Sequence, residues 1–179
     1  AGLEPSPGHV LTELCTDQGV EAEICVRLAH DLPPRDPPYD ADDILAAIAS
    51  AHPAIEVLQS RFVDVDKVDP LSNLADSLSH FGLVVGPAIA DWRTIDLATE
   101  QVGLVVNGTE MKRRTGNPAG DMLRLLVWLA NTGAVWAGGL QAGQYVTTGS
   151  WTAKDFVPPG AEARVVFDRA GTATVRFSA

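Results

Sequence analysis

Three glutamates lie inside apolar stretches of this sequence. Glu21 and Glu23 belong to residues 19–28, GVEAEICVRL, and Glu56 belongs to the segment PAIEVL. Alternate side chains of an extended strand share a face, so Glu21 and Glu23 point to the same side. Two carboxylates on one face repel each other unless water or a cation lies between them.

Three explanations remain open from the residues alone. The strands can present their acids to solvent, where exposed glutamate is common. The acids can form internal ion pairs, for which Arg27 and Arg61 are available. Alternatively, Glu21, Glu23 and Glu56 together bind a divalent cation, because Mg²⁺ and Mn²⁺ prefer oxygen ligands and leave positions for water and substrate.

The composition is that of a globular protein, with a net charge of −10 over 179 residues, of which 46% are hydrophobic. A strongly acidic chain argues against nucleic acid and anionic membranes as partners. No apolar run is long enough to span a bilayer. The two cysteines, Cys15 and Cys25, fit neither a disulfide framework nor a zinc site, so we expect a cytoplasmic protein.

The hydrophobic patterns predict many strands and few helices. The expected strands are residues 20–28, 52–62, 81–86 and 140–151. The expected helices or ordered turns are residues 41–51, after the N-cap Asp40, 70–80 and 117–131. The expected hairpins are residues 101–114, with Asn107-Gly108 as a type I′ turn, and 163–178.

These elements predict an α+β, β-rich fold, with about seven strands and two or three helices. We interpret residues 19–179 as a single catalytic-type domain. Residues 1–18 are expected to form a loop-like N-terminal segment, because they contain Pro5, Pro7 and Gly8.

Three segments, GVEAEICVRLAHDLP, PAIEVLQSRF and LADSLSHFGLVVG, resemble in their order the hydratase and decarboxylase branch of the fumarylacetoacetate hydrolase superfamily. The ending, LQAGQYVTTGSWTAKDFVPPGAEARVVFDRAGTATVRFS, is similar as well, since a Leu-x-x-Gly segment leads into a Thr-Gly strand and a final hairpin. The resemblance covers nearly all of residues 19–179, and Glu-x-Glu followed 33 residues later by Glu is more specific than Glu-x-Glu alone.

The resemblance implies the mixed β fold of that superfamily's C-terminal region, with flanking helices. It also implies a Mg²⁺ or Mn²⁺ ion held by Glu21, Glu23 and Glu56. The substrate of such enzymes is a small 2-keto or 2-hydroxy-dienoate, whose carboxylate and C2 oxygen chelate the metal.

The matching motifs imply further contacts. Asp76 and Ser79 match the branch's Ala-Asp-Asn-x-Ser segment and are expected to orient substrate or water, although Ser77 replaces its asparagine. Thr148 and Gly149 match the Thr-Gly pair that borders the pocket, and Thr148 is expected to bind the substrate carboxylate. The structural alternatives are a helix cap or turn for the first pair and an ordinary strand threonine for Thr148.

The implied function is a metal-dependent lyase that hydrates 2-hydroxypenta-2,4-dienoate (2-keto-4-pentenoate) to 4-hydroxy-2-oxopentanoate in aromatic catabolism. Two alternatives stay open: decarboxylation of 4-oxalocrotonate in the same site, and a non-catalytic partner subunit of the same fold. Family members tend to assemble, so we expect a homo-oligomer, with a complex with another pathway enzyme as the alternative.

One departure concerns a lysine near the substrate. Branch members carry it in a Gly-x-Lys-x-Gly-type segment before the Glu-x-Glu strand, whereas the lysines here, Lys67, Lys112 and Lys154, lie in other contexts. We therefore expect residues 1–18 to be the remnant of a longer N-terminal portion.

Overall fold

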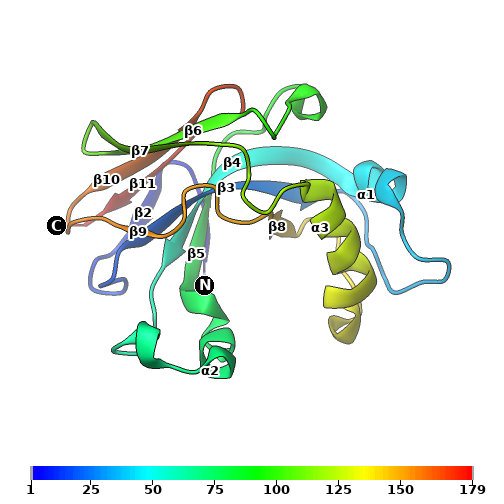
Figure 1. Ribbon diagram of the computed structural model, residues 1–179, viewed down its shortest axis with the longest axis horizontal. Helices are drawn as coiled ribbons and strands as arrows, with labels where there is room; N and C mark the ends of the chain where they lie inside the picture. The colour runs from blue at the N-terminus through cyan, green and yellow to red at the C-terminus, as the bar shows by residue number, and fades with distance from the viewer. Residues whose placement is uncertain (1, 179) are drawn as a thin grey trace.

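The structure of the protein, a computed structural model, describes residues 2–178, which form two β-sheets with short helices at their margins (Figure 1). Within these residues the six-stranded sheet has the order β1 (Gly2–Pro5), β5 (His80–Val85), β4 (Ile48–Leu58), β3 (Gly19–Leu28) and β8 (Tyr145–Thr147), with β9 (Asp155–Phe156) also on β3. The five-stranded sheet has the order β2 (Gly8–Val10), β11 (Gly171–Phe177), β10 (Glu162–Phe167), β6 (Gln101–Val106) and β7 (Thr109–Thr115). The α-helices are α1 (Ala41–Ala47), α2 (Pro70–Ala75) and α3 (Met122–Trp128).

The hydrophobic core lies between the two sheets. Ile24 and Val26 of β3 share one buried cluster with Val165 of β10 and Val175 of β11. Each fully buried side chain of this kind contributes about 1.5–3 kcal/mol relative to an exposed one. The same face of β3 therefore anchors the strand, and its opposite face is left for the alternating glutamates.

Helix α1 begins at the predicted N-cap. The Asp40 side chain accepts a hydrogen bond from the N–H of Asp43, and the Asp43 side chain accepts one from the N–H of Asp40. The helix ends at Ala47, so its predicted extension to residue 51 is wrong. Residues 48–51 instead belong to β4, where Ala51 pairs with Val26 of β3, and the strand continues through Pro53.

The expectation of a loop-like segment over residues 1–18 is wrong for two stretches. Strand β1 pairs in parallel with β5, with Gly2 opposite Gly82. Strand β2 pairs in parallel with β11, with Gly8 opposite Val175. Both partners are remote in the sequence, so no local pattern announces either strand; residues 1 and 179 lie outside the described part of the chain.

Both hairpins are confirmed. Asn107 and Gly108 join β6 to β7 with φ values of 48° and 83°, as a type I′ turn requires. Strands β10 and β11 form the second hairpin, with Phe167 opposite Gly171. The predicted strands at residues 52–62 and 140–151 are shorter in part, ending at Leu58 in β4 and confined to three residues in β8. The α+β, β-rich class is confirmed.

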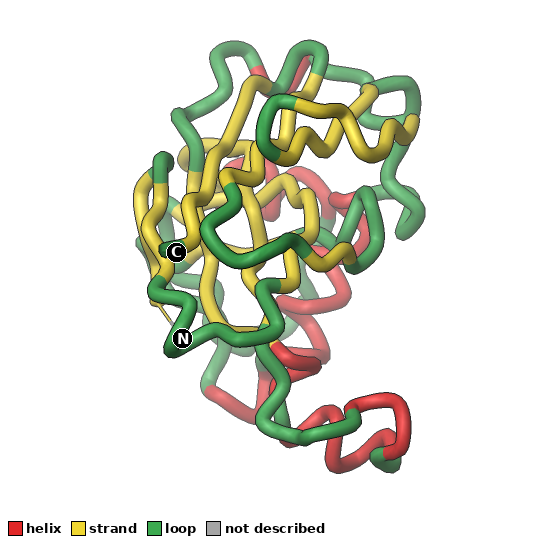
Figure 2. The backbone as a smooth tube through the Cα atoms, turned by 90° about the vertical axis from the view of Figure 1, so that its left-hand side faces the viewer, coloured by secondary structure: helices red, strands yellow, loops and turns green. Residues whose placement is uncertain are grey.

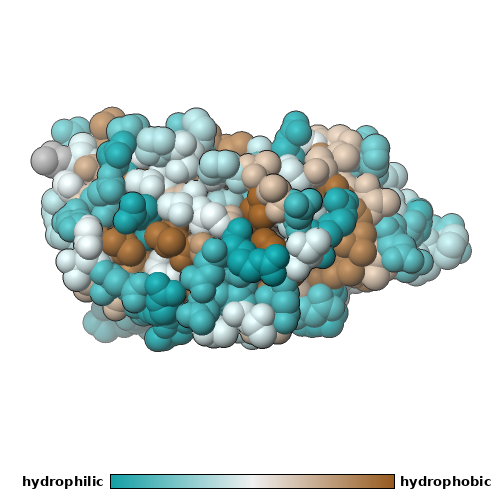
Figure 3. All heavy atoms as spheres, turned by 90° about the horizontal axis from the view of Figure 1, so that it is seen from above, coloured by the Kyte–Doolittle hydropathy of each residue, from teal (hydrophilic) through white to brown (hydrophobic). Residues whose placement is uncertain are grey.

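The helical segments lie at the periphery of the body formed by the strands (Figure 2). The face shown in Figure 3 mixes hydrophilic and hydrophobic residues, with apolar spots separated by polar side chains. Between residues 2 and 178, no helix has both the length and the apolar character needed to cross a membrane.

Candidate metal centre

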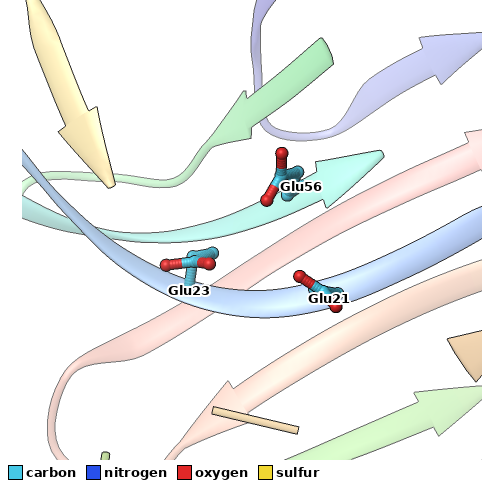
Figure 4. A group of neighbouring side chains, drawn as sticks. All are labelled: Glu21, Glu23 and Glu56. Atoms are coloured by element: carbon cyan, nitrogen blue, oxygen red, sulfur yellow. The ribbon is translucent and has the colours of Figure 1, made fainter. Parts of the chain in front are cut away.

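The pairing of β3 with β4 brings the three glutamates together. Glu21 lies directly opposite Glu56 in this antiparallel pair, and Glu23 is the next side chain of β3 on the same face. Each residue offers one carboxylate oxygen, and these three oxygens lie within 4.8 Å of one another. Figure 4 shows the two side chains of β3 and the one of β4 gathered at one place on the sheet.

Burial makes this cluster electrostatically unfavourable without a cation. Glu23 is only 2% exposed, and its Oε2 atom has no hydrogen-bond partner among the described residues. Burial, followed by repulsion from Glu56 and Glu21, raises the pKa of Glu23 to about 9, although the backbone N–H groups of Thr148 and Gly149 oppose the shift. Burial and then repulsion from Glu56 also raise the pKa of Glu21.

The explanation by a solvent-exposed face is wrong for Glu23, which is buried. The proposed ion pair between a glutamate and Arg61 is wrong as well, because the Arg61 Nε atom lies 3.4 Å from the Asp76 carboxylate. In the part of the chain that the structure describes, Arg27 forms no ion pair. Three convergent carboxylates, one with an orphaned buried oxygen, fit a hard divalent cation.

Cys25 follows Glu23 on the same face of β3 and is fully buried. Burial is the main cause that raises the pKa of its thiol to about 12, and the charge of Glu23 adds to the effect. A thiol that stays protonated is a poor metal ligand, so the donor set of this face consists of carboxylate oxygens.

A histidine joins the cluster that the sequence did not single out. The Nδ1 atom of His80, at the start of β5, lies 2.6 Å from the Oε1 atom of Glu56. The sequence signal was its place directly after Ser79, in a segment that already matched the branch. His52, which lies closer to Glu56 in sequence, is turned away and bonds to Ser50 and to the carbonyl of Gly86.

A hollow of about 390 Å³ adjoins the cluster at His80. Its lining residues are Gly2, Leu3, His80, Leu83, Gly143, Gln144, Tyr145 and Thr147. A larger hollow of about 580 Å³ lies between residues 96–98 and 115–122 and includes none of the three glutamates. The smaller hollow is therefore the candidate substrate pocket.

Asp76 and Ser79 lie beside this site, and Asp76 bonds to the protein. Its carboxylate accepts hydrogen bonds from Ser60 Oγ, at 3.0 Å, and from the backbone N–H of Arg61, at 3.2 Å. The backbone N–H of Ser79 donates to the Asp76 carbonyl at 3.1 Å. Asp76 thus ties the turn after β4 to the turn before β5.

Replacing Asp76 by alanine is expected to destabilise the protein by about 1–3 kcal/mol, because Ser60 and the Arg61 N–H lose a buried acceptor. Urea unfolding measures this change. Asp64→Ala is the matched control, since it removes an exposed ion pair with Lys67 that is worth about 0–1 kcal/mol. Equal stability of the two variants would contradict the anchoring role.

Thr148 and Gly149 lie beside Glu23. The Thr148 hydroxyl donates a 2.8 Å hydrogen bond to the carbonyl of Ile24, so its proton is used within the protein. The backbone N–H groups of both residues are directed at Glu23 and lower its pKa. The segment therefore holds β3 and Glu23 in place, and the predicted substrate contact of Thr148 stays a prediction.

No family model matches the chain. The chain is 31% identical over 159 residues to the 4-oxalocrotonate decarboxylase of Pseudomonas putida, which covers 88% of this chain and 59% of the relative. It is 29% identical over 161 residues to the 2-hydroxyhexa-2,4-dienoate hydratase of Comamonas testosteroni, with the same 88% and 59% coverage. The 4-oxalocrotonate decarboxylase of Pseudomonas putida G7, solved with magnesium and adipate, superposes with a TM-score of 0.83 at 30% identity, over 98% of this chain and 66% of that chain.

The chain belongs to the fumarylacetoacetate hydrolase superfamily. Both the predicted superfamily and its hydratase and decarboxylase branch are confirmed by these relatives, and the fold is that of the superfamily. The chain spans 59% of the length of these two curated relatives.

Proposed function

We propose that the protein is a metal-dependent lyase that hydrates 2-hydroxypenta-2,4-dienoate to 4-hydroxy-2-oxopentanoate in aromatic catabolism. The observation that supports it most is the cluster of Glu21, Glu23 and Glu56, whose carboxylate oxygens converge within 4.8 Å beside an open pocket. The similarity to a dienoate hydratase and to a decarboxylase solved with magnesium supports the same chemistry.

The three glutamates would hold a Mg²⁺ or Mn²⁺ ion. When bound, such an ion supplies a Lewis acid that stabilises negative charge developing on the C2 oxygen of the substrate. Glu23 needs this ion most, because its buried oxygen has no other partner among residues 2–178.

The face of the sheet beside the carboxylates suits a hydrocarbon chain. Cys25, Ala54, Leu83 and Val85 form a small buried cluster there, and Tyr145 packs against it. This apolar surface would receive the dienoate carbons, while Leu83 and Tyr145 also line the hollow. In this proposal Asp76 and Ser79 orient substrate or water through the turn they form, and Thr148 and Gly149 border the pocket.

Decarboxylation of 4-oxalocrotonate in the same site is the second candidate. The 31% identity to a 4-oxalocrotonate decarboxylase and the TM-score of 0.83 to the decarboxylase from Pseudomonas putida G7 favour it. The same electron sink at C2 would serve loss of CO₂ from a vinylogous β-keto acid, so the glutamates do not separate the two reactions.

Two substrates test the proposal. The purified chain is given 2-hydroxypenta-2,4-dienoate or 4-oxalocrotonate, with Mg²⁺, Mn²⁺ or EDTA, and ultraviolet absorbance follows the dienol while NMR identifies products. We expect formation of 4-hydroxy-2-oxopentanoate that falls at least about 100-fold with EDTA. Metal-dependent CO₂ release from 4-oxalocrotonate alone would replace the hydratase by the decarboxylase, and turnover of neither would favour a non-catalytic partner subunit.

We further propose that the protein acts in the cytoplasm as a homo-oligomer, alone or with another enzyme of the pathway. Both cysteines are free and buried, as is usual in a reducing compartment. Strand β1 is an exposed edge of its sheet, and assembly is one way to cover such an edge.

A further inference from the structure

The chain enters β5 through an unusual backbone turn. Ser77, Leu78 and Ser79 have φ values of 54°, 54° and 69°, so three consecutive residues that carry a Cβ adopt the left-handed region. L residues rarely adopt this conformation, and where it occurs the surrounding structure must hold it. The residue that this turn delivers to the sheet is His80.

The surrounding contacts hold the turn on both sides. The carbonyl of Ser79 accepts a 2.8 Å hydrogen bond from the N–H of Gln59, at the end of β4. The carbonyl of His80 accepts a 2.8 Å hydrogen bond from Arg61 Nη2. Arg61 is in turn paired with Asp76, so the backbone of His80 is fixed relative to the strand that carries Glu56.

The contact between His80 and Glu56 has a defined polarity. An ionised carboxylate only accepts hydrogen bonds, so a distance of 2.6 Å between Nδ1 and Oε1 requires the proton to lie on Nδ1. The other ring nitrogen, Nε2, makes no hydrogen bond within residues 2–178, and the ring lines the candidate substrate pocket. Glu56 has no other hydrogen-bond partner in the same part of the chain, so its Oε2 atom remains for a cation.

We infer that His80 is a positioning residue for the metal centre: its Nδ1–H group holds Oε1 of Glu56 and thereby directs Oε2 toward Glu21 and Glu23. This inference rests on the proposed metal site and deepens it. Outer hydrogen bonds of this kind orient metal ligands, and their loss commonly lowers metal affinity about 10- to 100-fold. The strained turn at residues 77–79 is then the means by which the chain brings the ring to Glu56.

Titration of the chain with Mn²⁺, followed by calorimetry and by electron paramagnetic resonance, tests the inference without any substrate. His80→Ala is expected to weaken Mn²⁺ binding about 10- to 100-fold and to change the spectrum of the bound ion. His80→Asn is expected to restore affinity to within a few-fold, because the asparagine Nδ2–H group lies at the same place along the side chain as Nδ1–H. His30→Asn, at an exposed histidine just after β3, is the matched control and should bind as the unmodified protein does.

The outcomes separate the two proposals. Unchanged Mn²⁺ affinity in His80→Ala overturns the role of His80 and leaves the metal centre standing, provided that Glu23→Gln loses affinity. Equal losses in His80→Ala and in a folded His80→Asn, checked by circular dichroism, also overturn the donor role. Absence of Mn²⁺ binding in the unmodified chain overturns the proposed function and this inference together.

Discussion

Glu23→Gln is expected to remove metal binding and, at the same time, to make the metal-free protein more stable. The substitution deletes the most deeply buried of the three carboxylates, so the loss of Mn²⁺ affinity should exceed the roughly 10- to 100-fold cost of losing an outer partner. Metal-dependent turnover should fall with it. Calorimetric titration with Mn²⁺ measures the first effect directly.

The gain in stability follows from the same burial. With a pKa of about 9 in the folded protein, Glu23 is largely protonated at pH 7, whereas the unfolded chain ionises it near its ordinary pKa of about 4.3. Folding at pH 7 therefore carries a penalty of roughly 3 kcal/mol from this one group. A glutamine has no such penalty, so urea unfolding in EDTA should show Glu23→Gln to be more stable by up to that amount.

Glu4→Gln is the matched control for both measurements, since Glu4 is an exposed glutamate of β1 in the same sheet. It should leave Mn²⁺ affinity and stability unchanged. A Glu23→Gln protein that binds Mn²⁺ as tightly as the control would refute the metal centre. A Glu23→Gln protein that loses both metal binding and stability would show that the carboxylate serves the fold.

The glutamate cluster shows how far the sequence reaches. Alternation in residues 19–28 placed Glu21 and Glu23 on one face, and the apolar flanks of Glu56 placed it in a second strand. The register that sets Glu21 opposite Glu56 is a property of the strand pair and was not predictable from either segment alone. The resemblance supplied the missing link, because it joined the three residues in one ligand set.

The errors have a common physical cause. Residues 48–51, Ile-Ala-Ser-Ala, continue a helical pattern, but pairing with β3 gives them more contacts as a strand than a further helical turn would. Strand β1 was missed for the same reason, since its partner lies about 80 residues away. His80 was underrated because a lone histidine has no local signal; only the strained turn before it places the ring at Glu56.

The stabilising effect of a bound divalent cation is expected to grow as the pH rises from 6 to 8. In the metal-free protein the pKa of Glu23 is raised to about 9, so between about pH 4.3 and 9 the folded state holds a proton that the unfolded state has released. The free energy of unfolding must then fall with rising pH, by up to about 1.4 kcal/mol per pH unit, or roughly 3 kcal/mol across this window. The raised pKa of Glu21 acts in the same direction.

Metal binding reverses this dependence, because the cation takes the place of the proton. Affinity for Mg²⁺ should therefore rise by up to about tenfold per pH unit toward pH 9, and the Tm difference between samples with Mg²⁺ and with EDTA should widen from pH 6 to pH 8. In Glu23→Gln this contribution is absent, so the difference should be small at every pH. A Tm difference in the unmodified protein that is constant over this window would mean that Glu23 is already ionised in the metal-free fold. The charge of the cluster would then have to be balanced by groups other than a bound proton, and His80, already in contact with Glu56, is the nearest such group.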